Sequence, residues 1–120
     1  MSFKSKFITI RDNYVINQVQ KAKIPVFPAD VIKRYRIVFR GRVQHVGFRL
    51  EVSEFAKRLH LTGFCKNMEN GDVLAELQGA ENKILFLISF MESLKRIKIQ
   101  EKVMEELEVN PSEKTFKSEV

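Results

Sequence analysis

The sequence predicts an α+β fold, an antiparallel sheet of four or five strands with two helices on one face. Alternation of apolar and polar residues begins at Arg34, two later segments repeat apolar residues at helical spacing, and turn residues separate the segments. The elements follow the order β-α-β-β-α-β and end with a short strand. A chain of 120 residues, 44% hydrophobic and 30% charged, can build one such core without disulfides.

The first strand begins at Arg34 and runs into the stretch 41–47. Its apolar residues share one parity and therefore face one side of the sheet: Tyr35, Ile37, Phe39 and Val43. Its basic residues have the other parity: Arg34, Arg36, Arg40 and Arg42. This alternation is typical of a strand with one buried face.

A helix, a strand and a hairpin follow. The helix is predicted by apolar residues three and four positions apart: Val52, Phe55, Ala56 and Leu59. Residues 61–63 end it, and 64–67 form a short second strand. Asn70-Gly71 is a hairpin turn, because both residues tolerate positive φ. The third strand then alternates Val73, Ala75 and Leu77 and ends at Gln78-Gly79.

The second helix is expected at about 81–96. Its run Ile84–Met91 is apolar on more than one side. We interpret this run first as core, with surplus surface that meets either the N-terminal segment or a second subunit. A fourth strand covers 99–109, with Val103, Leu107 and Val109 on one face, and 115–120 is a short edge strand. This arrangement is the split βαβ, or ferredoxin-like, fold.

Residues 1–32 differ from the rest. We interpret them as a partly ordered N-terminal extension, separate from a domain at 33–120. Phe7–Ile10 and Tyr14–Ile16 are β-prone runs around residues 11–13, which predicts a short hairpin. Pro25 and Pro28 argue against a helix in the stretch that follows.

Composition excludes several classes of protein. A single cysteine, Cys65, excludes an intramolecular disulfide and a cysteine-rich zinc site, and two histidines leave little for a metal cluster. No apolar run approaches the roughly 20 residues that cross a bilayer. The first residues do not resemble a signal peptide. We therefore expect a cytoplasmic protein without a metal, a cofactor or a membrane partner.

The formal net charge is +6, and most of the excess lies in residues 1–33. Arg34 to Arg49 contains five arginines and no acidic residue. This density suits an anion site, and a solvated strand face is an equal reading for Arg34 and Arg36. A nucleic-acid-binding sheet is disfavoured, because Tyr35 and Phe39 share the apolar parity and no RNA-binding aromatic motif is present.

The stretch 41–49, Gly-Arg-Val-Gln-His-Val-Gly-Phe-Arg, joins the first strand to the first helix. The first backbone N–H groups of a helix have no internal partner, and the helix dipole adds positive potential there. Gly41 and Gly47 permit a loop that turns these groups onto one point. Arg49 can add a planar fork that matches two oxygens of an anion. The stretch therefore predicts a phosphate or carboxylate site.

Residues 41–49 resemble the first motif of the acylphosphatase family, G-x-V-Q-G-V-x-F-R, at every fixed position but one. Gly63-Phe64-Cys65-Lys66-Asn67 is similar to the family's second motif, and Asn70-Gly71 supplies the glycine-containing turn that follows it. The resemblance covers roughly residues 33–120. It implies an acylphosphatase-like domain with the ferredoxin-like fold.

The resemblance implies a metal-independent hydrolase that splits an acyl phosphate into a carboxylate and inorganic phosphate. The motif arginine falls on Arg49, which would bind the phosphoryl oxygens, and the motif asparagine falls on Asn67, which would orient the attacking water. The phosphate-binding loop falls on Gln44, His45, Val46, Gly47 and Phe48. We expect a monomer or a weak homodimer.

His45 is the one departure, because the family has glycine there. Glycine adopts positive φ without strain, whereas histidine has a Cβ. Three outcomes follow: the loop tolerates His45 with its ring toward solvent, the loop is distorted, or a protonated imidazole donates to the anion. The departure also motivates an alternative function, a catalytically impaired acylphosphatase-like module that binds an anion or a partner.

Overall fold

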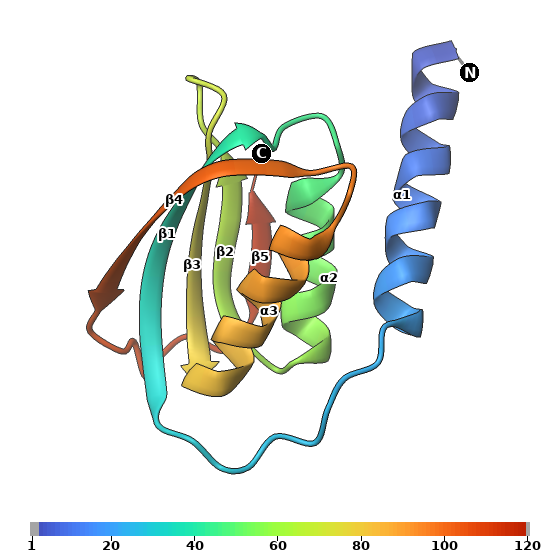
Figure 1. Cartoon of the computed structure of the whole chain (residues 1–120). Helices are drawn as coiled ribbons and strands as arrows, with labels where there is room; N and C mark the ends of the chain where they lie inside the picture. The colour runs from blue at the N-terminus through green and yellow to red at the C-terminus, as the bar shows by residue number, and fades with distance from the viewer. Residues whose placement is uncertain (1–2, 120) are drawn as a thin grey trace.

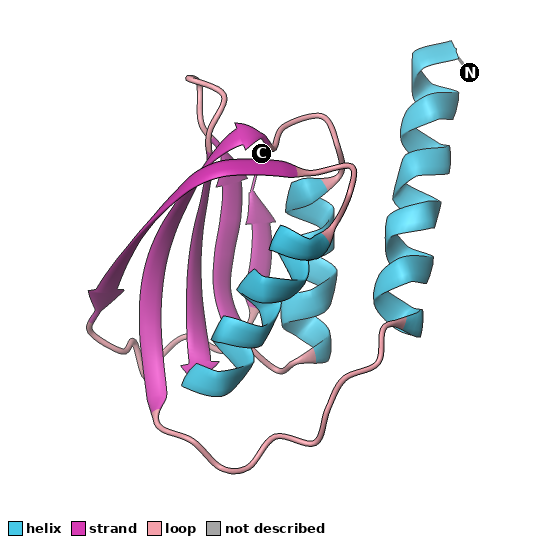
Figure 2. Ribbon diagram, viewed as in Figure 1, coloured by secondary structure: helices cyan, strands magenta, loops and turns pink. Residues whose placement is uncertain are grey.

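The computed structural model describes residues 3–119 and shows the expected elements in the expected order, preceded by one further helix (Figures 1 and 2). In chain order, these elements are α1 (Phe3–Lys21), β1 (Ile32–Arg42), α2 (Phe48–Arg58), β2 (Thr62–Asn67), β3 (Val73–Ala80), α3 (Glu81–Ser93), β4 (Lys98–Leu107) and β5 (Phe116–Glu119). The α+β, ferredoxin-like prediction is confirmed. The last residue of the expected edge strand, Val120, lies outside the described residues.

The five strands form one sheet in the order β4-β1-β3-β2-β5. β1 is antiparallel to both β3 and β4, and β2 is antiparallel to β3. β5 departs from the wholly antiparallel prediction, because it runs parallel to β2 and sets Glu119 opposite Lys66. The last described residue of the chain therefore lies beside the end of β2, close to the loop between β1 and α2 (Figure 1).

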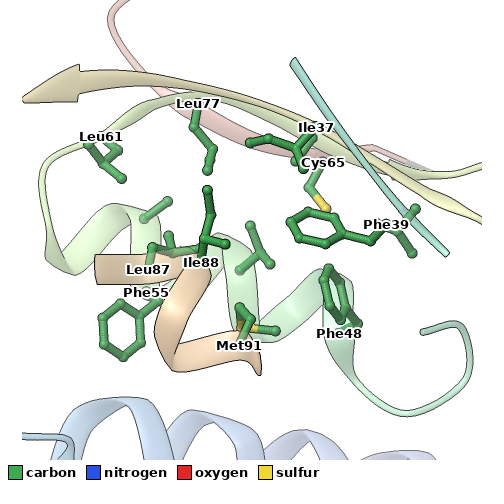
Figure 3. Close-up of a cluster of buried hydrophobic side chains, with 14 of the residues drawn as sticks. Ile37, Phe39, Phe48, Phe55, Leu61, Cys65, Leu77, Leu87, Ile88 and Met91 are labelled. Atoms are coloured by element: carbon green, nitrogen blue, oxygen red, sulfur yellow. The ribbon is translucent and has the colours of Figure 1, made fainter. Parts of the chain in front are cut away.

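One core fills the space between the sheet and the helices α2 and α3 (Figure 3). The predicted apolar parity of β1 is confirmed, since Ile37 and Phe39 are fully buried. The Phe39 ring packs against the ring of Phe48 at the start of α2, with 4.9 Å between centroids. Because burial of large apolar side chains is the main stabilising contribution, this packing also fixes where α2 begins relative to β1.

Val103 and Leu107 share one face of β4, as predicted, and this is the outer face of the sheet. Val103 is 47% exposed, and it pairs with Val38 on the outer face of the sheet. The register between β1 and β4 shifts near Arg40, so that Gln100 is an extra residue in β4. This bulge exchanges the two faces within the strand, and Met104, opposite Ile37, packs against the core instead.

The outer face of β1 is charged and paired. Arg34 is only 6% exposed and donates hydrogen bonds to Glu76 and Glu113, at 3.0 and 2.8 Å. Arg36 donates to the second oxygen of Glu76 at 3.1 Å. Arg40 forms an ion pair with Asp72 at 3.2 Å. These arginines are therefore parts of a carboxylate network and not an anion site. The alternative reading, a solvated strand face, is wrong for the buried Arg34 and fits Arg36, whose side chain is 46% exposed.

The predicted hairpin at the N-terminus is wrong, since residues 3–21 form the helix α1. Tertiary burial outweighs the local β preference of these residues. Val15 and Val19 lie four residues apart, on one helix face, and are both buried. Figures 1 and 3 show α1 beside the α2–α3 layer, on the side away from the sheet.

Side chains of the domain also hold α1 in place. Arg58 of α2 donates to the carbonyl oxygens of Val19, in the last turn of α1, and Ala22, which follows the helix. The linker that follows packs Phe27 edge-on against Phe86 of α3, with 5.4 Å between centroids. The surplus apolar surface of α3 thus meets the N-terminal segment, which is one of the two partners predicted for it.

Candidate active site

A cavity of about 350 Å³ lies where the β1–α2 loop, the end of β2, β5 and α1 meet. Its wall contains both residues predicted to be catalytic, Arg49 and Asn67. The residues that line it are Ile8, Arg11, Asp12, Val43, His45, Gly47, Phe48, Arg49, Leu50, Asn67 and Ser118. The fold therefore brings together two motifs that are separate in the sequence.

The loop into α2 has the left-handed geometry that an anion cradle requires. Gly47 is the N-cap of α2 with φ 81°, and His45 has φ 63°. The backbone N–H groups that begin α2 lack partners from a preceding turn, and the positive end of the helix dipole lies at the same place. An anion in the cavity would be stabilised by both.

His45 fits the loop in the left-handed conformation that glycine would adopt there. Its side chain is exposed and lines the cavity. Histidine is among the residues enriched at such φ values, so the departure from the family motif is compatible with the loop. α2 starts three residues later, at the motif phenylalanine.

Two residues, Gln44 and Val46, fix the loop through hydrogen bonds to neighbouring segments. The Gln44 side chain donates to the carbonyl oxygens of Met68 and Asp72, at 2.7 and 2.8 Å, and so ties the loop to the β2–β3 hairpin. The carbonyl oxygen of Val46 accepts a hydrogen bond from Arg96 at 2.8 Å. Of the five predicted loop residues, the other three line the cavity: His45, Gly47 and Phe48.

Arg49 is the second residue of α2, half-buried, and its guanidinium is held by β5. Its Nη1 donates to the carbonyl oxygen of Glu119 at 2.6 Å. A carbonyl is a neutral acceptor, so this bond orients the guanidinium without neutralising its positive charge. Asn67, the last residue of β2, pairs with Val73 of β3 and so has a fixed backbone.

Cys65, two residues before Asn67, belongs to the core. It is fully buried, and burial raises the pKa of its thiol to about 12, against a smaller lowering by the charge of Arg49. A thiol with this pKa stays protonated at neutral pH and is not a nucleophile. Cys65 is therefore the small buried residue that its place in the second strand predicts.

Sequence reasoning missed the residues that α1 adds to the cavity, Ile8, Arg11 and Asp12. None lies in a motif of the family, and the segment that holds them was expected to form a hairpin. It also missed Ser118, which enters from β5. The sequence signal that could have pointed to the residues of α1 was the excess of basic residues at the N-terminus.

Arg96 connects α1 with the loop. It donates to Gln18 of α1 at 2.9 Å, to the carbonyl of Val46 in the loop, and to Glu51 of α2. Glu51 is fully buried, and this burial raises the pKa of its carboxyl group, while Arg96 opposes the shift. The guanidinium therefore places a positive charge next to the buried carboxyl group beneath the loop.

Within residues 3–119, no three side chains of His, Cys, Asp or Glu gather in a way that would hold a metal ion. None of the helices in the same range is long and apolar enough to span a membrane.

The ferredoxin-like sheet and the cavity at the N-terminal end of α2 define the class of protein as a small α+β domain. Residues 35–118 match the family model described as Acylphosphatase, and the chain belongs to the acylphosphatase family. An acylphosphatase from Geobacillus thermodenitrificans is 38% identical over 72% of this chain and 93% of its own length. One from Clostridium beijerinckii is 50% identical over 47% of this chain and 62% of its own length.

Among solved structures, an acylphosphatase from Bacillus subtilis matches with a TM-score of 0.68 and 27% identity, over 75% of this chain and 100% of that one. The family, the fold and the predicted enzyme class, a hydrolase of acyl phosphates, are confirmed by these matches. The matched range begins at Tyr35, so α1 lies outside it.

Proposed function

We propose that this chain hydrolyses acyl phosphates with Arg49 and the backbone amides of residues 44–48 binding the phosphoryl group and Asn67 orienting the attacking water. The observation that carries the proposal is the shared cavity: Arg49 and Asn67 line it together, at the N-terminal end of α2. Acyl phosphate would be the substrate, and a carboxylate and inorganic phosphate the products.

Binding rests on charge and directed donors. The guanidinium of Arg49 is oriented by the carbonyl of Glu119 and keeps its charge for the phosphoryl oxygens. The first amides of α2 add donors in a fixed frame, since Glu51 N bonds to Gly47 O at 2.9 Å and closes the first helical turn. Donors fixed before the reaction stabilise the charge that develops on the equatorial oxygens without rearranging.

In the chemical step, the water oxygen attacks phosphorus while the bond from phosphorus to the acyl oxygen breaks. The carboxylate leaves with the bonding electrons, and the proton of the water passes to the new phosphate or to solvent. A carboxylate is a good leaving group, so a strong acid is not required. The amide of Asn67 can position the water by accepting and donating, without a shifted pKa.

Asn67→Ala tests the water-orienting role. With a small aryl acyl phosphate such as benzoyl phosphate, we expect kcat to fall by about 100-fold, because a positioned nucleophile is lost, with little change in inhibition by inorganic phosphate. Asn17→Ala, which removes an exposed asparagine of α1, is the matched control. If kcat of Asn67→Ala equals that of the wild type, the assigned role is wrong. If wild type does not exceed background, the enzyme assignment fails.

Three coarser expectations are part of the proposal. Hydrolysis that persists in excess chelator would support a metal-independent reaction. An elution volume that changes little over a hundredfold range of concentration would support a monomer or a weak homodimer. Cell fractionation would test the cytoplasmic location.

A further inference from the structure

Helix α1 forms one wall of the active-site cavity. Ile8, Arg11 and Asp12 line the same cavity as Arg49 and Asn67. The contact with the loop is direct: a Cβ added to Gly47 would lie 2.9 Å from Val15 Cγ2 and 3.5 Å from Arg11 Cδ. The stem of Arg11 therefore rests on the residue that caps α2.

The helix is also firmly placed. Its buried valines, the bonds from Arg58 to its C-terminal carbonyls and the bond from Arg96 to Gln18 anchor it from three directions. A substrate held by Arg49 and the loop amides therefore lies in the same cavity as this wall.

The charges on the wall indicate which part of the substrate it meets. Arg11 donates to Asp12 at 2.9 Å, and the two side chains are 32% and 37% exposed. A carboxylate disfavours a phosphoryl dianion, so the pair suits the acyl end of the substrate better than the phosphoryl end. The pair is partly exposed and local to one helix, so Arg11 can exchange Asp12 for another carboxylate at little cost.

We propose that Arg11 determines substrate specificity by binding a second carboxylate on the acyl group, so that the preferred substrates are monophosphorylated dicarboxylic acids. This inference rests on the proposed hydrolysis of acyl phosphates. Arg49 and the loop hold the phosphoryl group, and Arg11 binds the distal carboxylate as a bidentate, charge-assisted partner. Asp12 competes for the same guanidinium and limits the preference.

The test compares substrates of equal chain length with and without the second carboxylate: succinyl against butanoyl phosphate, and glutaryl against pentanoyl phosphate. For at least one pair, we expect wild-type kcat/KM to favour the dicarboxylic substrate by about tenfold, the effect of one charge-assisted hydrogen bond. Arg11→Met keeps the stem that packs on Gly47 and should abolish this preference. The inhibition constant for inorganic phosphate should stay unchanged, because phosphate fills only the phosphoryl subsite.

If the inference is right, Asp12→Asn should strengthen the preference for the dicarboxylic substrate that Arg11→Met abolishes. Removal of the competing carboxylate should raise the preference by about threefold further. Lys6→Ala, the loss of an exposed charge on the same helix, is the control for long-range attraction and should leave the preference intact. Circular dichroism confirms that α1 remains folded in each variant.

If wild type hydrolysed the dicarboxylic and the monocarboxylic substrate of each pair with equal kcat/KM, the proposed role of Arg11 would be overturned. The enzymatic function would not be affected by that result. An equal loss of preference in Lys6→Ala and Arg11→Met would overturn it as well, because charge alone would then explain the selectivity. If wild type hydrolysed none of the four acyl phosphates, the proposed function itself would fail.

Discussion

Arg34, near the start of β1, and Arg49, at the start of α2, belong to the same domain but have different surroundings. Arg34, on the outer face of the sheet, is surrounded by the carboxylates of Glu76 and Glu113. Arg49, at the start of α2, is oriented by a backbone carbonyl. Ion pairs with these two carboxylates neutralise the charge of Arg34. Within residues 3–119, Arg49 forms no ion pair with a carboxylate side chain, and its guanidinium donates to a backbone carbonyl. The acceptor that holds an arginine therefore separates a structural role from an anion-binding role.

The largest effect that this comparison predicts is on catalysis. Arg49→Ala should lower kcat/KM for an acyl phosphate by about 10²-fold to 10³-fold, because it removes a charge aimed at the reacting group. Arg36→Ala removes a guanidinium from the outer face and should change kcat/KM less than twofold. Steady-state hydrolysis of benzoyl phosphate measures both. A loss of the same size in the two variants would refute the distinction.

Arg34→Ala should act on stability instead. It leaves two carboxylates close together in a buried position, and loss of one partner from a buried ion pair costs about 3 kcal/mol in the free energy of unfolding. Urea unfolding measures this loss, and kcat of the folded protein should stay unchanged. Adding Glu113→Gln to Arg34→Ala should recover part of the stability, because one of the orphaned charges is removed.

How much of the fold and of the site could be predicted from the sequence depends on how far apart along the chain the interacting residues lie. The motif 41–49, the alternation in β1 and the helical spacing around Phe55 are local patterns, and each one is present as predicted. Arg49 and Asn67 were assigned to one site by the family resemblance, and both line the cavity. These two lining residues were thus predictable from contiguous motifs and that resemblance.

The failures have a common physical cause, contacts between distant parts of the chain. The β-branched residues of α1 favour a strand locally, and burial of Val15 against the domain makes them helical. The bulge at Gln100 changes the face of β4 without a local signal such as glycine. Arg11 lines the cavity because α1 packs against the domain through Val15. It belongs to no family motif, so no motif could have identified it.

The network around Arg34 also predicts a pH effect. Burial would raise the pKa of the Glu113 carboxyl, but Arg34, together with Thr62 and Lys117, outweighs it and holds the pKa below its ordinary value of 4.5. A carboxylate with a lowered pKa stabilises the fold above its unfolded pKa, and the contribution disappears as pH falls through the folded pKa. The stability of wild type should thus decrease below about pH 4.5.

Glu113→Gln isolates this contribution. The variant should be less stable than wild type at neutral pH, and the difference should close as the pH is lowered. Urea unfolding at several pH values measures the gap, and Glu108→Gln, at an exposed position, serves as the control. A gap that stays constant down to about pH 3 would show that Glu113 does not titrate in the network.

The smallest effect is expected at His45, and it decides between an intact and an impaired enzyme. The loop already holds His45 at φ 63°, so His45→Gly removes a strain of about 1 kcal/mol without moving the amides around the anion. We expect kcat/KM to change by less than tenfold and the phosphate inhibition constant by a similar factor, because Arg49 remains the main cation. A gain of a hundredfold would show that histidine obstructs the cavity and would revive the impaired-module alternative. A tenfold or larger loss would instead assign the ring a share of the binding that the proposal gives to Arg49 and the loop amides.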